Sequence, residues 1–277
     1  MTQEPCELSL VLVTYNSLDF IENCLNSLAG ALGKISHEII VVDNASQDGT
    51  ADRVAKTYPG IRLLRNPENL GYPKANNLGI AAASGPFILL LNPDTEPGPG
   101  VLERLLTEIK LRPEAGAAAP VLRLPSGAIQ VSYGRRVSLS AEMFKKLGGN
   151  RYLSRQAGRK KEPRQMGWLG GACLLIRREC LEKIQGFDEH YFLYFEDIDL
   201  CFRIREAGWK LWHIPEIEVR HLGGASTSAA ALFSRYHYRR SQVYFYRKHA
   251  GVVSRLGLKF YLALTFVGLY IKGALKG

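Results

Sequence analysis

Short apolar runs alternate with helical patterns through the first third of the chain. The runs have the length and the β-rich composition of strands, and the apolar positions between them recur at the three- and four-residue spacing of a helix. This alternation predicts an α/β fold with a mostly parallel sheet whose strands all end at one rim. Open sheets of this kind bind their ligands at that rim. The predicted strands are Leu8–Thr14, Glu38–Val42, Ile61–Arg65 and Pro86–Leu91.

The pattern is less regular in the second half of the chain. A helix is predicted at Leu102–Leu111, after which the order loosens as far as Trp168. It resumes with a strand at Ala172–Arg177, a helix over residues 196–208 and a strand at Leu211–Ile214. These elements complete the predicted core.

The 277 residues can bury a sizeable core as one elaborated domain. We expect a catalytic domain over residues 1–232, with a nucleotide-binding half at 1–111 and an acceptor-binding, catalytic half at 112–232. A helical tail is expected at 233–277.

The tail begins with cations and aromatic residues and ends in an apolar run at residues 256–271. That run is shorter than the ~20 residues that a membrane-spanning helix needs, and it contains Lys259. We therefore expect a helix that lies in the membrane interface rather than one that crosses it. A helix docked on the protein core is the alternative.

The formal net charge of +10 favours anionic partners. Lysines and arginines gather in a segment at 134–165, which we expect to be a basic loop. Neither interleaved aromatic residues nor a nucleic-acid-binding motif accompanies them, so we expect no nucleic-acid partner. Sugar phosphates and an anionic membrane surface remain as candidate partners.

The N-terminus lacks the basic and apolar regions of a secretory signal, so we expect a cytoplasmic protein. The five cysteines form no CxxC pair, and we expect buried small side chains rather than disulfides or zinc ligands.

Candidate metal chemistry begins at Asp94, two residues after a predicted apolar strand. A carboxylate at this place suits Mg²⁺ or Mn²⁺ bound jointly with a diphosphate, because magnesium takes one or two protein carboxylates together with phosphate oxygens. The segment Asn92–Asp94 also has the composition of a plain turn.

A second carboxylate, Asp43, follows a strand at the same predicted rim and is suited to accept a hydrogen bond from the imide N–H of uracil or thymine. Ser46 has the place of a helix cap, and so has Asn16. The residues Thr14, Tyr15 and Asn16 end the first strand and are candidates for contacts to the base.

The segment from Asn69 to Lys74 enters a helix through a turn at Gly71, which suits an anion near a helix N-terminus. Lys74 as a solvent-exposed side chain is an equally good interpretation.

Three acids open the helix predicted at 196–208. Asp199 is explained by an i,i+4 pair with Arg203. Glu196 and Asp197 follow aromatic residues, whose packing would bury them and raise their pKa toward the range of a general base. His221 closes a strand before two glycines, and a lone histidine in such a place is usually structural.

In this order and spacing, the motifs resemble those of family-two glycosyltransferases, specifically the bacterial rhamnosyltransferase-like branch. The resemblance extends from Leu8 to Ser226. It rests on Val13–Asn16, Val42–Ser46, Asn69–Tyr72, Leu91–Asp94, Gly170–Ala172, Gly186–Glu189, Phe195–Leu200 and His221.

The resemblance implies a GT-A fold, a divalent cation and a nucleoside-diphosphate sugar donor that reacts once, with inversion at the anomeric carbon. Asp43 matches the base-binding acid, Asp94 the metal-binding acid and Asp197 the general base, with Glu196 as the fallback base. His221 matches a further metal or phosphate contact. Asn92 replaces the first acid of the DXD-type motif, so Asp94 would be the sole carboxylate ligand.

Gly170 and Gly171 would lie along the sugar pocket, and Trp168 would lie there too or pack in the core. We expect transfer of rhamnose or another hexose from a dTDP- or UDP-sugar onto a saccharide or a polyprenyl-diphosphate-linked acceptor, at the inner face of the plasma membrane. A nucleotidyltransferase and a non-catalytic nucleotide-sugar-binding module are the alternatives.

Overall fold

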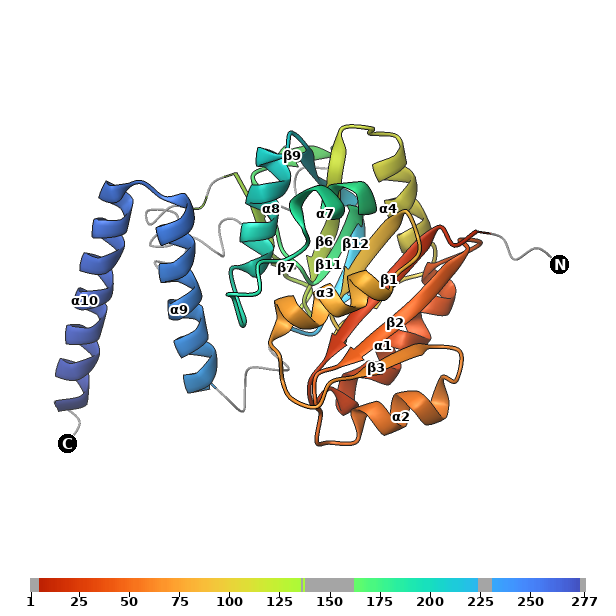
Figure 1. Cartoon of the computed structure of the whole chain (residues 1–277), viewed down its shortest axis with the longest axis horizontal. Coiled ribbons are helices and arrows are strands. Elements are labelled where there is room, and N and C mark those ends of the chain that lie inside the picture. Colours follow the sequence, from red (N-terminus) through yellow and green to blue (C-terminus); the bar gives the residue numbers. More distant parts are fainter. Residues whose placement is uncertain (1–4, 136, 138–161, 224–230, 275–277) are drawn as a thin grey trace.

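The computed structural model describes residues 5–135, 137, 162–223 and 231–274. A central sheet lies between two layers of helices, and a pair of C-terminal helices lies at one end of the molecule (Figure 1). In chain order the elements are β1 (Leu8–Thr14), α1 (Leu18–Ala31), β2 (His37–Asp43), α2 (Thr50–Thr57), β3 (Arg62–Arg65), α3 (Tyr72–Ala82), β4 (Phe87–Leu91), β5 (Thr95–Pro97), α4 (Val101–Lys110), β6 (Ala115–Arg123), β7 (Ile129–Gln130), β8 (Tyr133–Gly134), β9 (Arg164–Met166), β10 (Trp168–Leu169), β11 (Cys173–Arg177), α7 (Arg178–Ile184), α8 (Glu196–Glu206), β12 (Lys210–His221), α9 (Ala231–His249) and α10 (Val252–Ala274).

The main path of the sheet has the order β3-β2-β1-β4-β11-β6-β12-β5, with β7 and β9 paired beside it. The strands β1 to β4 are mutually parallel where they pair, and β6 and β12 run in the same direction. Only β11, between β4 and β6, and the short β5 run against them on this path. The ends of β1, β2, β4 and β12 and the start of β11 therefore meet at one edge of the sheet. We call this edge the carboxyl rim; it is marked by Thr14, Asp43, Leu91 and His221.

Alternate residues of the central strands point into two cores. On one face Leu10 and Leu12 pack beneath α1, α2 and α4. On the other face Val11 and Leu90 pack beneath α7 and α8, and α3 covers the neighbouring strands. Both faces of the sheet are thus apolar, as expected for parallel strands with helices on both sides. Four of the five cysteines are buried, as expected, whereas Cys6 is only partly buried.

Five of the six predicted strands lie within one residue of the observed bounds at each end. The strand predicted at Leu211–Ile214 extends from Lys210 to His221, and the central strand β6 was not predicted. The prediction of a continuous loop over residues 134–165 is wrong at both ends, because Gly134 lies in β8 and Arg164 begins β9. Pairing of β9 with β12 draws Arg164 into the sheet. The basic residues from Lys145 to Lys161 lie outside the described residues, whereas Arg135 is described.

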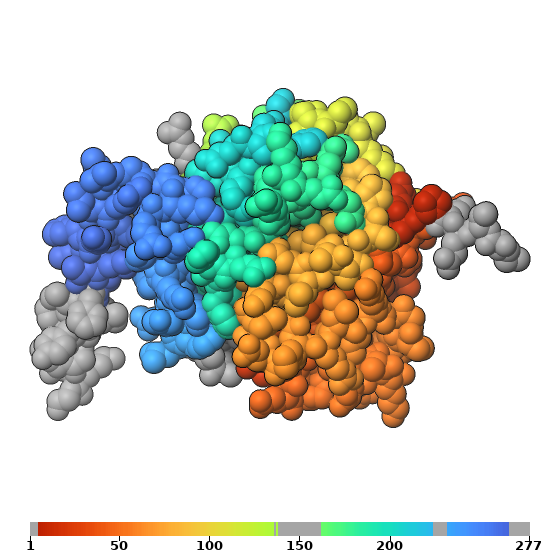
Figure 2. Space-filling model, viewed as in Figure 1, coloured from red at the N-terminus to blue at the C-terminus, as the bar shows by residue number. Residues whose placement is uncertain are grey.

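Residues 231–274 form two adjacent helices, of which α9 lies nearer to α8 (Figure 1). Aromatic side chains join α9 to the segment before α8, with Tyr191 and Phe195 on one side and Phe245 and Tyr246 on the other. The pair forms a lobe at the edge of the molecule in the space-filling view (Figure 2). Within the described residues, no helix has both the length and the hydropathy of a membrane span.

Candidate functional site

The first part of the site lies where β1 and β2 end. Thr14 and Asp43 are opposite each other in the strand register, and the Thr14 hydroxyl donates to Asp43 Oδ1 at 3.0 Å. The backbone N–H of Ser46 donates to Asp43 Oδ2 at 3.0 Å. Both oxygens of this buried carboxylate are thereby fixed, and each retains acceptor capacity for a further donor.

The loops after β1 and β2 are bound together. The backbone N–H of Asn16 donates to Ser46 Oγ at 2.9 Å, and Asn16 Oδ1 accepts from the backbone N–H of Gln47. Ser46 and Asn16 are therefore not helix caps, contrary to that interpretation of the sequence. The α2 cap is Gly49, and Asp48 accepts from the first N–H of α2 instead. Tyr15 is 45% exposed beside this junction.

A buried asparagine, Asn44, holds the turn that leads into α3. Its side chain donates to Asn69 Oδ1 at 2.8 Å and accepts from the backbone N–H of Leu70 at 3.0 Å. Asn69 Oδ1 also accepts from the N–H of Gly71. Asn69 therefore stabilises the turn with its side-chain oxygen, and Lys74 is exposed in the first turn of α3.

Gly71 is the position in this turn where only glycine fits. Its φ is +82°, in the region that side chains disfavour, and a Cβ atom would lie 2.7 Å from the carbonyl oxygen of Phe192. The next backbone N–H, that of Tyr72, donates to the same carbonyl at 2.8 Å. This contact brings the segment before α8 against the start of α3.

Tyr72 connects the two halves of the site. Its hydroxyl donates to Asn92 Oδ1 at 3.0 Å and lies 3.4 Å from the carbonyl oxygen of Gly171. Burial raises the pKa of Tyr72 well above its usual range, so the phenol stays a neutral donor. The side-chain oxygen of Asn92 is consequently engaged by Tyr72.

Asp94 and His221 form the candidate metal centre. His221 is opposite Thr95 in the pairing of β12 with β5, which brings His221 Nε2 to 3.2 Å from Asp94 Oδ1. His221 Nδ1 lies 2.6 Å from Gln130 Oε1, an acceptor, so Nδ1 carries the proton. The lone pair of Nε2 is then free, and this buried atom finds no hydrogen-bond partner in the described part of the chain.

This arrangement fits a divalent cation. A metal-binding histidine commonly donates its other ring N–H to a fixed acceptor, as His221 does to Gln130. Among the described residues, no group of three or more His, Cys, Asp and Glu side chains gathers into a metal site. Two protein ligands would therefore need diphosphate or water oxygens to complete the coordination sphere.

Glu196 and Asp197 open α8 next to the glycines that precede β11. Asp197 Oδ2 accepts from the backbone N–H of Gly171 at 3.1 Å, and Asp197 Oδ1 accepts from that of Ile198 at 2.8 Å. Glu196 is 7% exposed, and its Oε2 has no hydrogen-bond partner within the described residues. Both oxygens of the Asp197 carboxylate are thus supported by donors, whereas one oxygen of Glu196 is left without a donor.

The two carboxyl groups influence each other. Burial, followed by the negative charge of Asp197, raises the pKa of Glu196 well above its usual range. Burial also raises the pKa of Asp197, against the opposing effect of backbone hydrogen bonds from Gly171, Ile198 and its own N–H. We infer that Glu196 keeps its proton while Asp197 titrates. Tyr194 and Phe195, directly before the pair, both adopt left-handed backbone conformations, and such strain is often found at functional sites.

Asp199 is structural. Its carboxylate, fully buried, accepts from Arg203 at 2.7 Å, as the sequence spacing predicts. It also pairs with Lys248 at 2.8 Å and His249 at 2.7 Å, which anchors the end of α9 to α8. Trp168 packs against the second core.

The structure brings most predicted site residues to the carboxyl rim, in neighbouring groups along the sheet. Gly171 contacts Asp197, and Gly170 pairs with the backbone of Ser132. Sequence reasoning missed three residues that hold the others in place. Asn44 and Tyr72 lay inside recognised motifs, whereas nothing in the sequence marked Gln130, whose partner is 91 positions away.

Comparison with known proteins identifies the family. The sequence model of glycosyl transferase family 2 matches residues 9–185. The chain is 35% identical over 263 residues to an N-acetylglucosaminyl-diphospho-decaprenol L-rhamnosyltransferase of Mycobacterium tuberculosis, which covers 88% of this chain and 85% of the relative. An O-antigen biosynthesis protein, RfbC of Myxococcus xanthus, is 26% identical over 82% of this chain and 18% of that protein.

Solved structures show the same fold. A mannosyltransferase from Pyrobaculum calidifontis, in complex with GDP-Man and Mn²⁺, matches with a TM-score of 0.60 and 20% identity, over 89% of this chain and 64% of that chain. GalNAc-T7 with UDP, GalNAc and Mn²⁺ matches with a TM-score of 0.62 and 19% identity, over 91% of this chain and 53% of that chain. The chain spans less than two thirds of either structure. The fold is of the GT-A type, and the chain belongs to glycosyl transferase family 2.

Proposed function

We propose that this glycosyltransferase moves rhamnose from a dTDP- or UDP-linked donor onto an N-acetylglucosaminyl-diphospho-polyprenol, with inversion at the anomeric carbon. The observation that carries the proposal is the position of three groups at one rim: Asp43, Asp94 with His221, and Asp197. We assign them to the base, to a cation and to a proton, respectively. The similarity to a rhamnosyltransferase whose acceptor is lipid-linked supports the choice of sugar and acceptor.

The donor lies along the rim in this proposal. Asp43 accepts from the imide N–H of the base, beside the exposed ring of Tyr15, with Thr14 and Asn16 holding the surrounding loops. Asp94 and His221 would hold Mg²⁺ or Mn²⁺. Such a cation would supply Lewis-acid stabilisation of the leaving group, so no protein acid would be needed there.

Asp197 is the proposed general base. Its carboxylate is fixed by the N–H groups of Gly171 and Ile198, and a raised pKa suits proton removal near neutral pH. The acceptor hydroxyl gives its proton to Asp197, its oxygen bonds to the anomeric carbon, and the bond to the diphosphate breaks. Glu196 stays protonated and keeps a second negative charge away from the reacting centre.

We place the enzyme in the cytoplasm, peripheral on the inner face of the plasma membrane, where a lipid-linked acceptor is accessible. Support comes from the tail at residues 231–274, which contains eight lysines and arginines and no aspartate or glutamate. Basic and apolar residues together suit an anionic membrane surface.

A thermal-shift panel of dTDP, UDP, GDP and CMP, each with and without Mn²⁺, tests the donor site. We expect Mn²⁺-dependent stabilisation by dTDP or UDP in the wild type and its loss in Asp94→Ala. The control is Asp52→Ala, which removes a carboxylate that is 81% exposed and lies on α2. Equal stabilisation of wild type and Asp94→Ala would refute the metal site, and no stabilisation by any nucleotide would favour a non-catalytic module.

A further inference from the structure

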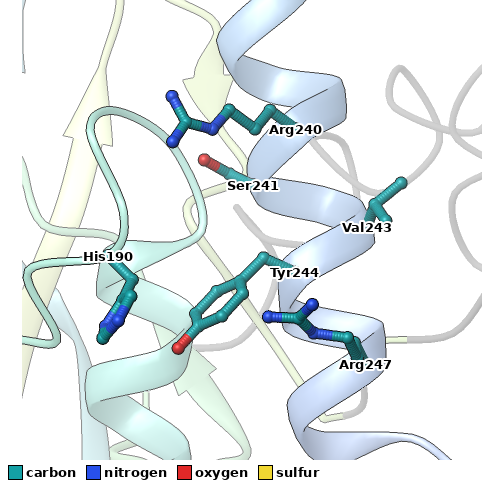
Figure 3. Close-up of a pocket in the computed structure, with 6 residues that line it drawn as sticks. All are labelled: His190, Arg240, Ser241, Val243, Tyr244 and Arg247. Carbon is teal, nitrogen blue, oxygen red and sulfur yellow. The ribbon is translucent and has the colours of Figure 1, made fainter.

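A groove separates α9 from the segment before α8, outside the site already described. It has a volume of about 300 Å³ and is lined by one face of α9 and by His190 (Figure 3). The Arg240 side chain extends toward the same side of α9 as Tyr244, and the Arg247 guanidinium points toward the Tyr244 ring (Figure 3). The His190 and Tyr244 rings are stacked, with centroids 5.6 Å apart.

The groove is cationic. Arg240 and Arg247 are exposed, and neither forms an ion pair with a carboxylate in the described part of the chain. Arg247 contacts the Tyr244 ring, with its guanidinium carbon 5.3 Å from the centroid. The two arginines are seven residues apart, a rise of about 10 Å along the helix, so their long side chains can reach one anion between them.

Asp188, which binds two residues beside the groove, does not neutralise these arginines. Asp188 accepts from the Tyr244 hydroxyl at 3.0 Å, from Lys248 at 2.6 Å and from His190 Nδ1 at 2.9 Å. Although burial opposes ionisation, the hydrogen bonds from Lys248 and His190 hold the pKa of Asp188 well below its usual range. Its charge is thus paired with Lys248, which leaves the two guanidinium groups available.

The groove is connected to the catalytic pair. Tyr244 holds Asp188, and the Ser241 hydroxyl donates to the carbonyl of Leu193 at 2.8 Å, so α9 is attached to both ends of the segment 188–193. The same segment binds the backbone of Tyr72 through Phe192 and continues into Glu196. A ligand in the groove therefore lies beside the chain segment that positions the proposed base.

The helix α10, which contacts α9, presents four exposed apolar side chains on one face: Val253 is 85% exposed, Leu256 59%, Phe260 68% and Leu264 56%. An exposed apolar face on the helix next to α9 favours an anion carried on a lipid over a free anion in water.

We propose that this groove binds the diphosphate of the lipid-linked acceptor through Arg240 and Arg247, with His190 and Tyr244 as its walls. This inference rests on the proposed function, because it assumes a diphosphate-bearing acceptor. Arginine binds phosphate oxygens in paired, charge-assisted hydrogen bonds, and a diphosphate offers enough oxygens for both side chains.

Acceptor kinetics in neutral detergent test the groove. The variant is Arg240→Gln with Arg247→Gln, and the control is Arg235→Gln, which removes one exposed arginine of α9 outside the groove. Two acceptors are compared: a short-chain N-acetylglucosaminyl-diphospho-prenol and an alkyl N-acetylglucosaminide of equal chain length without phosphate. We expect the double variant to raise KM at least about 10-fold for the first acceptor only, with kcat and the donor KM unchanged. An equal change for both acceptors, or no change, would overturn the proposal.

Binding of inorganic diphosphate separates this proposal from the proposed function, because it needs no turnover. Calorimetric titration is carried out without metal on Asp94→Ala, with and without the two groove substitutions. We expect binding that the groove substitutions remove. If binding is the same in both proteins the groove proposal fails, even when the enzyme transfers rhamnose. If wild type transfers no sugar but binding depends on the two arginines, the proposed function fails and the anion site stands.

Vesicles of phosphatidylglycerol distinguish the acceptor from a lipid headgroup. The Arg235→Gln control shows how much vesicle binding weakens when one exposed positive charge is lost. We expect binding of the double variant to weaken by no more than the loss of its two charges explains on that scale. Loss of vesicle binding in the double variant with an unchanged acceptor KM would assign the groove to headgroups and overturn the proposal.

Discussion

Replacement of Glu196 by glutamine is predicted to leave the enzyme active and make it more stable. Glu196 is buried, one of its oxygens is unpartnered, and its pKa is raised by burial and by Asp197. The glutamine side chain imitates the protonated acid, so Glu196→Gln should retain kcat within about 10-fold. Asp197→Asn keeps an acceptor for the Gly171 N–H but removes the base, so we expect a loss of about 10²- to 10⁴-fold.

The stability change follows from proton linkage. Above about pH 4.5 the unfolded chain loses the Glu196 proton, whereas the folded protein retains it because the folded-state pKa is raised. Wild-type stability contributed by this group therefore falls by up to about 1.4 kcal/mol for each pH unit until the folded-state pKa is reached. Glu196→Gln does not have this pH-dependent loss. The difference in free energy of unfolding between Glu196→Gln and wild type should therefore grow as the pH rises.

Urea denaturation at pH 5.5, 6.5 and 7.5 measures the advantage, and pH profiles of kcat/KM measure the role in catalysis. The acidic limb should stay in place in Glu196→Gln, since Glu196 is already neutral where Asp197 titrates. A constant stability difference across the three pH values would refute the raised pKa. Inactive Glu196→Gln combined with active Asp197→Asn would make Glu196 the base.

Three further predictions concern other parts of the molecule. Gly71→Ala should lower the free energy of unfolding by at least about 2 kcal/mol in urea denaturation, because a Cβ atom would meet Phe192 and the backbone is left-handed; a neutral effect would contradict this. Gln130→Leu should weaken Mn²⁺ binding about 10- to 100-fold in calorimetry with nucleotide present, since His221 loses its acceptor, while unchanged affinity would show that Gln130 does not orient the ring. Burial, with a contribution from Arg164, lowers the pKa of His213 to about 3. Below about pH 6.5 the unfolded chain therefore binds a proton at His213 that the folded protein does not bind. The free energy of unfolding of the wild type should then fall by up to about 1.4 kcal/mol for each pH unit of acidification. His213→Gln should show a smaller acid loss in the same denaturation experiments, and parallel pH curves for the two proteins would argue against a buried neutral histidine.

The fold of the first third of the chain could be predicted from the sequence because local pattern and burial agree there. The strand Leu8–Thr14 is buried along its whole length, and the helix that follows places Ile21, Cys24, Leu25 and Leu28 in the core at the predicted spacing. The residues at the carboxyl rim could be predicted from the same pattern, because a residue at the end of a strand lies at the edge of the sheet.

The strand β6 was not predicted because its small residues allow a helix to pack closely against it but have low strand propensity. It contains five small residues in a row, and Ala115–Arg123 lies in the middle of the sheet. A Cβ atom at Gly116 would lie 2.7 Å from Trp209 Cβ and 2.9 Å from Ile204, so small residues are needed where α8 approaches. Such a sequence has little β-branched or aromatic character, and only the tertiary structure explains it.

The parts of the site that depend on pairing between distant strands could not be predicted from the sequence either. His221 faces Asp94 only because β12 continues for seven residues beyond its predicted end and pairs with the short β5. The β12 strand also shifts register between Ile214 and Glu218, where Pro215 interrupts its pattern. A single sequence contains no signal for such a pairing, whereas the charge and aromatic content of the tail were visible from the start.

The most direct measurement is product analysis with labelled dTDP-rhamnose, N-acetylglucosaminyl-diphospho-prenol and Mg²⁺ or Mn²⁺, on wild type and Asp197→Asn. We predict one added rhamnose with inverted anomeric configuration in the wild type, lost on chelation of the metal and in Asp197→Asn. A folded wild type that makes no such product from dTDP- or UDP-sugars, or Asp197→Asn as active as the wild type, would contradict the proposed reaction and its base.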